Sequence, residues 1–317
     1  MKRIDPRALG LMPLVAALLA SCTVFNGLNA ADRSPDAALD TGNTNDTKDV
    51  AGEEATSDTA IIDTAIIDTT TNDAPTDTDT SIDTASDATI TKAERYRAAV
   101  LADSPLLYLR LDEATGKLVA TDSSSGKRDC TYLGAVELQS TGAFSDSKAV
   151  RLTDTENVEC AVTPFDFAGA SPFTVEAWVN ADTIPTDYPR IVSKEVASPR
   201  SGYSVSIQSS PLQVLFERWD GGSLKTYVAV PFPGTGRWVH VAASWDGTTA
   251  KLFVDGAPAS KGYSGLTFSA NTSPLTFGLA SSGVGGSFRG SVDEIAVYPS
   301  ALPSSRIAAH ISAAVDP

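Results

Sequence analysis

Cysteine, methionine and histidine are scarce in this sequence, which has three Cys, two Met and two His among 317 residues. No Cys-X-X-Cys spacing occurs, and the two histidines, His240 and His310, lie far along the chain from the cysteines. A zinc site of the common cysteine–histidine type is therefore not expected. The Gly-X-Ser-X-Gly motif is also missing, so nucleophilic catalysis by a serine has no support.

Paired carboxylates are missing from every predicted strand. Glycoside hydrolysis needs two carboxyl groups that face each other across the scissile bond. On one strand this requires a spacing of two residues, because alternate side chains share a face. Glu176 is alone on its face, between Thr174 and Trp178, and we expect it to be exposed or to line a groove. The adjacent Asp293 and Glu294 would point to opposite faces. The chain is therefore predicted not to be an enzyme, unless carboxylates from different strands converge.

Basic residues are few, with 24 Lys and Arg against 39 Asp and Glu, for a formal net charge of −15. No basic stripe is available for nucleic acid, so that class of partner is not expected. Residues 23–91 alone hold 15 acidic and two basic residues, and they are rich in Thr, Asp, Ala and Ser. Such a segment cannot bury enough apolar surface to fold. We expect residues 22–90 to be a disordered acidic linker and residues 91–317 to form one domain.

The apolar run near the N-terminus, residues 8–20, is too short to span a bilayer. Basic residues precede it, and Leu19-Ala20-Ser21-Cys22 follows it, which resembles a bacterial lipobox. Residues 1–21 are therefore predicted to be a lipoprotein signal peptide, with Cys22 lipidated; the alternative is an ordinary signal peptide. Thr23 follows the cysteine where Asp would favour retention at the inner membrane. We expect a bacterial cell-envelope protein held by lipid alone, at the outer membrane.

Two cysteines remain for the folded part, Cys130 and Cys160. An even number of cysteines in an oxidising compartment favours a disulfide. The alternative is a pair of buried free thiols. Each cysteine lies in a strand-like run, so we expect the bond to join two strands.

Residues 238–256 contain the clearest local signal in the chain. A strand-like run to Trp245 is followed by Asp246-Gly247-Thr248-Thr249 and a second run from Ala250 to Val254. Asp-Gly between two such runs predicts a hairpin. Short runs of the same kind, with Gly and Pro between them, recur along residues 106–298, which favours an all-β sandwich or jelly roll. A capping box at Thr91 predicts a helix to about Ala102, and a second helix is expected from Pro303.

These blocks, taken in order, resemble a laminin-G-like, concanavalin-type jelly-roll domain. The quoted hairpin is joined by SPFTVEAWVNAD at 171–182, GYSVSI at 202–207 and GSVDEIAVYPSALPSSRIAAHI at 290–311. The resemblance implies a fold of two antiparallel sheets and, most often, a binding role. It also implies a structural calcium ion, held by Asp122 of the DSSSG loop and Asp293 of the Asp-Glu segment. Glu113 is a further candidate ligand, because calcium prefers six to eight oxygens.

Aromatic residues near loops are the candidates for ligand binding, since aromatic faces stack on sugar rings and anchor protein interfaces. The candidates are Tyr203, Trp219 and Tyr227, with Arg218 beside Trp219. Trp178, Trp238 and Trp245 lie in strand-like runs and are expected in the core. The leading hypothesis is a non-catalytic module for a glycan or an extracellular protein. The alternatives are a structural envelope protein without a small ligand and a polysaccharide hydrolase or lyase.

Overall fold

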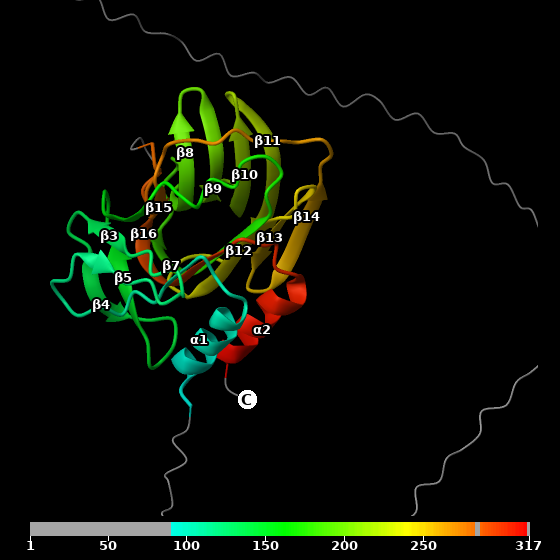
Figure 1. The fold of residues 1–317 in the computed structure, drawn as a ribbon. Helices are drawn as coiled ribbons and strands as arrows, with labels where there is room; N and C mark the ends of the chain where they lie inside the picture. Colours follow the sequence, from blue (N-terminus) through cyan, green and yellow to red (C-terminus); the bar gives the residue numbers. More distant parts are fainter. Residues whose placement is uncertain (1–89, 283–285, 316–317) are drawn as a thin grey trace, which may run out of the picture. The chain divides into compact units, whose positions relative to one another are not determined.

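The computed structural model describes residues 90–282 and 286–315. The predicted signal peptide, the lipidated Cys22 and the linker up to residue 89 lie outside the described residues. Two antiparallel sheets of eight strands each make up the fold, with one helix near each end of the described chain (Figure 1). The expected all-β, concanavalin-like class is therefore confirmed. Neither helix in the described ranges has the length and apolar character that a membrane crossing would need.

Sheet A has the strand order β14-β13-β12-β7-β16-β5-β4, and β1 also pairs with β16. The strand bounds are β1 Leu107–Leu109, β4 Glu137–Thr141, β5 Lys148–Leu152, β7 Phe173–Thr183, β12 Val239–Trp245, β13 Thr249–Val254, β14 Ala257–Gly262 and β16 Arg289–Tyr298.

Sheet B has the strand order β11-β10-β9-β8-β15-β6-β3-β2. The strand bounds are β2 Val119–Ala120, β3 Cys130–Leu133, β6 Asn157–Cys160, β8 Arg190–Ala197, β9 Arg200–Ser209, β10 Leu212–Asp220, β11 Ser223–Pro231 and β15 Leu275–Phe277. Strands β8 to β11 are long and follow one another in space as they do in sequence, so this half of the sheet is a meander.

The main hydrophobic core lies between the two sheets. Alternate residues of each strand enter it, because successive side chains of a strand point to opposite faces. In β10, for example, Val214 and Phe216 are in this core, whereas the alternating Glu217 faces the other side of sheet B. Trp245 is fully buried here, as expected from the sequence.

The predicted hairpin is formed by β12 and β13, which pair from Trp245↔Ala250 to Val241↔Val254. Its turn is closed by Asp246, whose carboxylate accepts hydrogen bonds from the backbone N–H groups of Thr248 and Thr249 at 2.9 and 2.7 Å. Gly247 has a φ of +100°, a region that other residues rarely adopt. The local sequence therefore fixes both the hairpin and its register.

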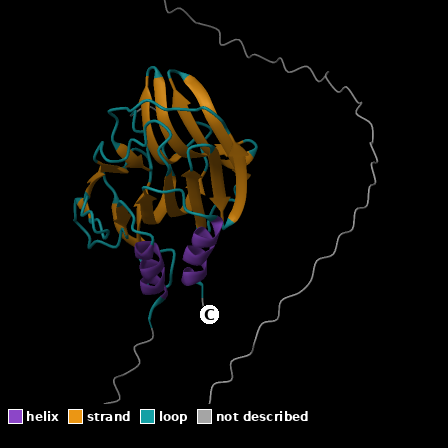
Figure 2. Ribbon diagram, turned by 45° about the vertical axis from the view of Figure 1, so that its right-hand side comes forward, coloured by secondary structure: helices purple, strands orange, loops and turns teal. Residues whose placement is uncertain are grey.

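Helices α1 (Lys92–Ala102) and α2 (Ser304–Ala314) lie side by side against the outer face of sheet A (Figures 1 and 2). They cover a second hydrophobic cluster, to which α1 contributes Tyr96 and α2 contributes Ile307. Thr91 caps α1 through a 3.2 Å hydrogen bond from the Glu94 backbone N–H, as the capping-box pattern predicted. Pro303 is the N-cap of α2 rather than its first helical residue. Both described helices pack on sheet A, which leaves the outer face of sheet B without a helical cover.

Two parts of the sheet arrangement differ from the sequence prediction. Residues 130–138, whose sequence is typical of one continuous strand, instead contribute to two strands, β3 in sheet B and β4 in sheet A. Gly134, with a φ of +82°, lies in the connection between them. Strand β14 was not predicted because its sequence, APASKG, has no apolar alternation. It is mostly exposed and lies at the edge of sheet A, where pairing needs no buried face.

Candidate functional site

The outer face of strands β8 to β11 is a polar surface that the sandwich leaves open. Ser193, Ser204, Glu217 and Tyr227 face one another in one cross-strand row, one residue from each strand. The two serines are fully buried, and Glu217 and Tyr227 of the same row line a hollow on this face together with arginine and aromatic side chains.

The hollow is a cavity of about 300 Å³. That volume is at the small end of the range for ligand sites, about 300–1,000 Å³. Its lining residues are Tyr188, Arg190, Arg200, Leu215, Glu217, Trp219 and Tyr227. Aromatic rings, a short aliphatic surface and two guanidinium groups therefore meet in one place.

Glu195, behind this cavity, holds both arginines. Its side chain is only 4% exposed. One carboxylate oxygen accepts hydrogen bonds from Arg200 Nε and Nη2, at 2.9 and 2.5 Å, and the other accepts from Arg190 Nε at 3.0 Å. Ser193 Oγ lies 3.3 Å from the second oxygen. Because the carboxylate is buried and fully engaged, the two guanidinium groups are fixed relative to each other.

Trp219 forms one side of the cavity and stacks with Arg200. The guanidinium carbon lies 4.0 Å from the ring centroid, within the range of a cation–π contact. Gly202 is opposite Trp219 in the register, and a Cβ atom at Gly202 would lie 1.9 Å from the Lys194 carbonyl oxygen. A glycine is therefore required at this position. It leaves the space beside Trp219 free of a neighbouring side chain on β9.

Glu217 is the one acidic residue in the cavity lining. Burial raises the pKa of its carboxyl group above the usual value, and the nearby Arg200 and Arg190 partly offset that rise. Arg200 Nη2 lies 3.5 Å from the Glu217 carboxylate. The lining therefore carries two permanent positive charges and one carboxyl group whose ionisation is disfavoured by its surroundings.

A second hollow of about 380 Å³ lies at the ends of the β8–β9 and β10–β11 hairpins. Ser201 and Asp220, next in sequence to Arg200 and Trp219, contribute to its lining. Asp220 accepts a 2.9 Å hydrogen bond from the Ser269 backbone N–H, and this contact lowers the pKa of its carboxyl group. The other lining residues are Val196, Ser198, Pro199, Gly221, Ala270, Asn271 and Thr272.

The structure places two of the four predicted ligand residues, Trp219 and Tyr227, in the same cavity. It places the other two, Arg218 and Tyr203, in the core, each 1% exposed, so their prediction as surface ligand residues is wrong. They are directly paired in the β9–β10 register and both point between the sheets. Arg218 donates to the Phe167 carbonyl at 2.8 Å, and its guanidinium lies 3.5 Å from the Phe268 ring centroid. Burial lowers the pKa of Arg218 to about 9.

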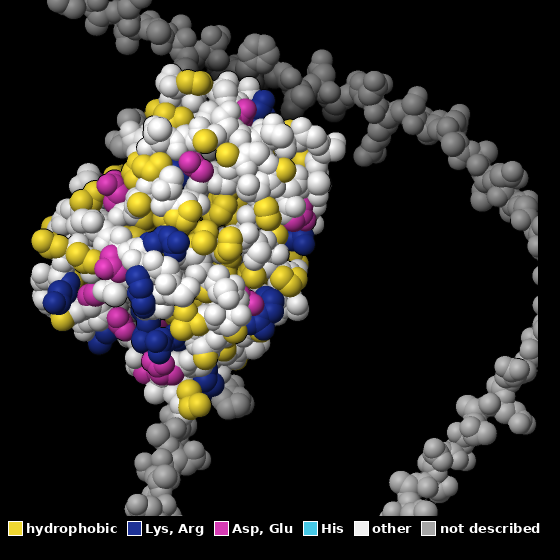
Figure 3. All heavy atoms as spheres, in the orientation of Figure 1, with side chains coloured by type: hydrophobic (Ala, Val, Ile, Leu, Met, Phe, Trp, Pro, Cys, Tyr) yellow, Lys and Arg dark blue, Asp and Glu magenta, His cyan; other side chains and the backbone are white. Residues whose placement is uncertain are grey.

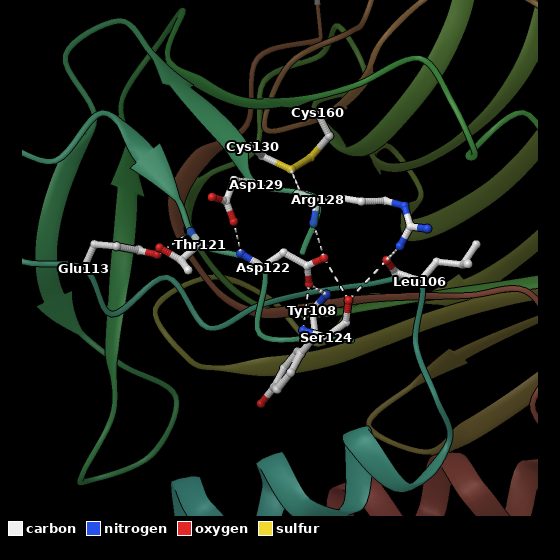
Figure 4. Close-up of a disulfide and its surroundings, with 10 residues drawn as sticks. All are labelled: Leu106, Tyr108, Glu113, Thr121, Asp122, Ser124, Arg128, Asp129, Cys130 and Cys160. Carbon is white, nitrogen blue, oxygen red and sulfur yellow. Dashed lines mark hydrogen bonds between the residues drawn. A yellow bond between two sulfur atoms is a disulfide. The ribbon is translucent and has the colours of Figure 1, made fainter. Parts of the chain in front are cut away.

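The three predicted calcium ligands do not form a calcium site. No group of three or more acidic, histidine or cysteine side chains suited to a metal occurs within residues 90–282 and 286–315. Asp122 is fully buried and accepts four hydrogen bonds, two from Ser124 and one each from the Tyr108 and Arg128 backbone N–H groups (Figure 4). Its oxygens are therefore used to close the DSSSG loop.

The other two predicted ligands are also occupied by protein donors. Glu113 accepts from the Thr121 backbone N–H at 2.7 Å and from the Tyr132 hydroxyl at 2.5 Å. Asp293 accepts from Ala143 N and Ser147 Oγ through one oxygen, at 2.8 and 3.0 Å. Burial raises the pKa of Asp293 to about 7.

Cys130 and Cys160 form a disulfide, as expected from the sequence (Figure 4). It joins the neighbouring strands β3 and β6 of sheet B across 30 residues of chain. The bond lies in the core beside the Asp122 loop rather than at the β8–β11 face. Its role is therefore to hold this part of the sandwich together.

Glu176 is 1% exposed and lies under the helices, so the prediction of an exposed or groove-lining position is wrong. His310 of α2 lies 2.9 Å from its carboxylate, and His240 of β12 lies 3.2 Å from it. The Tyr298 hydroxyl donates to it at 2.5 Å. This cluster attaches the C-terminal helix to sheet A and is closed to a substrate.

The sequence analysis did not identify Arg190, Glu195, Arg200 and Glu217 as site residues. They come from three different strands, and no spacing along the chain shows that one carboxylate would hold two of these arginines. The face shown in Figure 3 carries Lys and Arg side chains interspersed with Asp and Glu, rather than one continuous basic area.

Comparison with protein-family models matches residues 150–308 to the concanavalin A-like lectin/glucanases superfamily. Comparison with curated proteins finds no significant match.

Among solved structures, one similar structure is the binding domain of botulinum neurotoxin DC in complex with SialylT, at 13% identity and a TM-score of 0.51. The alignment covers 68% of this chain and 52% of that one. A second is the same toxin's binding domain with rat synaptotagmin II, at 14% identity, a TM-score of 0.52 and the same two coverages. This chain thus spans about half the length of these domains, and at such identities the likeness concerns the fold.

Proposed function

Because the chain belongs to the concanavalin A-like lectin/glucanases superfamily, we propose that its folded part is a non-catalytic module that binds a glycan on the outer face of β8 to β11. The observation that carries this proposal is the cavity of about 300 Å³ that contains Trp219, Tyr227 and two arginines. Stacking of a sugar ring on an aromatic face and hydrogen bonds from fixed guanidinium groups are the contacts that such a surface offers. The solved structures with SialylT and with synaptotagmin are compatible with binding roles for this fold.

Hydrolysis of a polysaccharide is the second candidate function, because Glu195 and Glu217 both approach Arg200. The raised pKa of Glu217 would suit a general acid. A glycosidase needs a second carboxylate that also reaches the scissile bond. Glu195 lies behind the cavity, and both its oxygens are bound by arginines. We therefore favour binding without catalysis.

The proposal is tested by exposing the full chain, with Cys22→Ser to prevent acylation, to an immobilised panel of plant, bacterial and animal glycans. We expect retention on one class of glycan. Chromatography of each retained polysaccharide after prolonged incubation should show no shortened products. If shortened products appear and Glu217→Gln abolishes them, the protein is a hydrolase rather than a non-catalytic binding module. Folded protein that is retained on no glycan would contradict the proposal and favour a protein partner or a structural role.

We further propose that the protein is exported and anchored at the outer membrane of a bacterium through a lipid on Cys22. The support is the order Leu19-Ala20-Ser21-Cys22 after a short apolar run. When the chain is expressed in a bacterial host, radiolabelled palmitate should label it, and the protein should enter the detergent phase on phase separation. Cys22→Ser should abolish both, whereas Ser21→Ala should preserve them. If palmitate still labelled the Cys22→Ser variant, the proposal of a lipid anchor on Cys22 would be contradicted.

A further inference from the structure

The two arginines of the cavity retain donors that the protein does not use. Arg190 donates through Nε to Glu195 and through Nη1 to the Tyr188 carbonyl, and Arg200 donates through Nε and Nη2 to Glu195. Within the described residues, neither Arg190 Nη2 nor Arg200 Nη1 has a hydrogen-bond partner, and neither is buried. Both groups therefore present free N–H donors on residues that line the cavity.

These donors are held in position before a ligand arrives. The Glu195 carboxylate fixes both guanidinium planes, and Trp219 supports one of them by stacking. Glu195 is itself held by Ser193 Oγ, and its backbone N–H donates to Ser281 Oγ at 2.6 Å. These donors are therefore already ordered, and little binding free energy would be lost in ordering them when a ligand binds.

The charge of the lining favours an anion over a neutral group. Two guanidinium groups lie in the lining against one carboxyl group, that of Glu217. The negative charge of Glu195 lies behind them and is used by the ion pairs. Guanidinium forks match the geometry of carboxylate and sulfate oxygens, whereas a neutral sugar hydroxyl needs no such charge.

We propose that the glycan recognised in this cavity is acidic, with its carboxylate or sulfate group on Arg190 and Arg200 and a sugar ring on Trp219. This inference rests on the proposed glycan-binding function and adds the class of ligand to it. The sugar ring and the charged substituent would be recognised by different parts of the same cavity. The two contributions can therefore be separated by experiment.

The test compares matched polymers on the full chain carrying Cys22→Ser, by biolayer interferometry at fixed ionic strength. Polygalacturonate is paired with its carboxyl-reduced galactan, and dextran sulfate is paired with dextran. Binding to at least one charged polymer should be about tenfold tighter or more than to its neutral partner, because charged hydrogen bonds contribute about 1.5–3 kcal/mol. The pair that shows the difference identifies carboxylate or sulfate as the group recognised.

Variants locate the effect and separate it from general attraction between a polyanion and a protein. Arg200→Gln and Arg190→Gln should each remove most of the difference. Arg237→Gln, at an exposed ion pair with Asp255 in another part of the chain, should leave it unchanged. Arg200→Lys keeps the charge but loses the fork, and it should retain only part of the preference. If Arg237→Gln reduced the preference for the charged polymer as much as Arg190→Gln and Arg200→Gln do, the proposed site would be overturned.

The outcomes distinguish this inference from the proposed function. If charged and neutral polymers bind equally well and Trp219→Ala weakens both, glycan binding stands and the acidic preference is overturned. If the folded protein binds none of the four polymers or any glycan in the wider panel, both are overturned. Circular dichroism and thermal unfolding of every variant show whether a loss of binding results from a loss of folded structure.

Discussion

Replacing Glu176 by alanine is expected to lower the free energy of unfolding by about 3–5 kcal/mol, the usual cost of removing one partner from a buried ion pair. The Glu176 carboxylate lies between helix α2 and sheet A and is 1% exposed. His310, which lies 2.9 Å away on α2, would lose its partner within sheet A. The Tyr298 hydroxyl, which donates to the carboxylate, would be left in an apolar surrounding without an acceptor.

The measurement is urea-induced unfolding of the full chain, followed by tryptophan fluorescence. Glu137→Ala is the matched control, because Glu137 also forms an ion pair, with Arg151, but has a side chain that is 59% exposed. Exposed pairs contribute about 1 kcal/mol or less, so the control should unfold close to the wild type. If the two substitutions change the unfolding free energy equally, the buried cluster does not stabilise the attachment of the helix.

The same cluster is expected to contribute most to stability in weakly acidic solution. Burial raises the pKa of Glu176, but close contacts with His240 and His310 outweigh burial and lower it. Its contribution is present above the unfolded value of about 4.5 and is lost as the pH falls towards the folded value. Burial lowers the pKa of His310, but contacts with Glu176 and Asp103 outweigh burial and raise it. That contribution is complete below about 6.5 and is lost as the pH rises through the folded value.

The contribution of the Glu176–His310 pair should therefore be largest between about pH 4.5 and pH 6.5. Asp293, with its pKa raised from 3.8 to about 7, disfavours folding increasingly as the pH rises between those values, so the wild-type curve alone does not isolate the histidine. His310→Gln is the needed comparison, and its unfolding midpoint should fall less than that of the wild type on going from weakly acidic to weakly alkaline solution. Parallel curves would contradict the prediction. The other titratable or charged groups facing this cluster are Tyr96, Asp103, His240, Tyr298 and Arg306.

Features that depend on neighbouring residues in the sequence were predicted correctly. The hairpin at Asp246-Gly247 and the helix capped by Thr91 each depend on contacts within a few residues, and both are present. For the hairpin and the helix cap, the local sequence contains the whole physical cause, so no knowledge of the sheet order was needed. The disulfide was predicted for a different reason, the even count of cysteines, and it joins residues 30 positions apart.

Errors arose where the cause lies in the pairing of strands. Arg218 and Trp219 are adjacent, yet one enters the core and the other lines the cavity, because successive residues of β10 face opposite sides. Sequence alternation shows that the two differ but does not show which face is open. That depends on the helices, which cover sheet A and leave sheet B exposed. The same cover explains why Glu176 is buried.

The described residues do not support the predicted set of calcium ligands, for a related reason. Asp122 lies in a short loop and was predicted to bind calcium. Its carboxylate instead accepts hydrogen bonds from four donors of the protein. Loop-closing aspartates and metal-binding aspartates have the same local sequence. They differ in which donors the fold brings to them, and two of these donors belong to residues 108 and 128, away from the loop's own serines.

Trp219→Ala is expected to weaken glycan binding by about 30- to 150-fold, which corresponds to about 2–3 kcal/mol, the size of effect seen when a central aromatic anchor is removed. Two contributions are lost together. The indole face is no longer available to a sugar ring, and Arg200 loses the ring on which it stacks at 4.0 Å. Because Glu195 still holds Arg200 through two of its nitrogens, the larger share of the loss should come from the missing sugar contact.

Trp219→Phe separates the two contributions, since a phenyl ring keeps a stacking face of smaller area. It should bind between the wild type and Trp219→Ala in titration calorimetry with the glycan that the panel identifies. Leu118→Ala, at a side chain that is 70% exposed and outside the cavity lining, is the control for surface substitution and should bind like the wild type. If Trp219→Ala binds like the wild type, the cavity is not the site. The hollow lined by Ser201 and Asp220, beside the same strands, would then be the next to mutate, because it also offers polar side chains to a ligand.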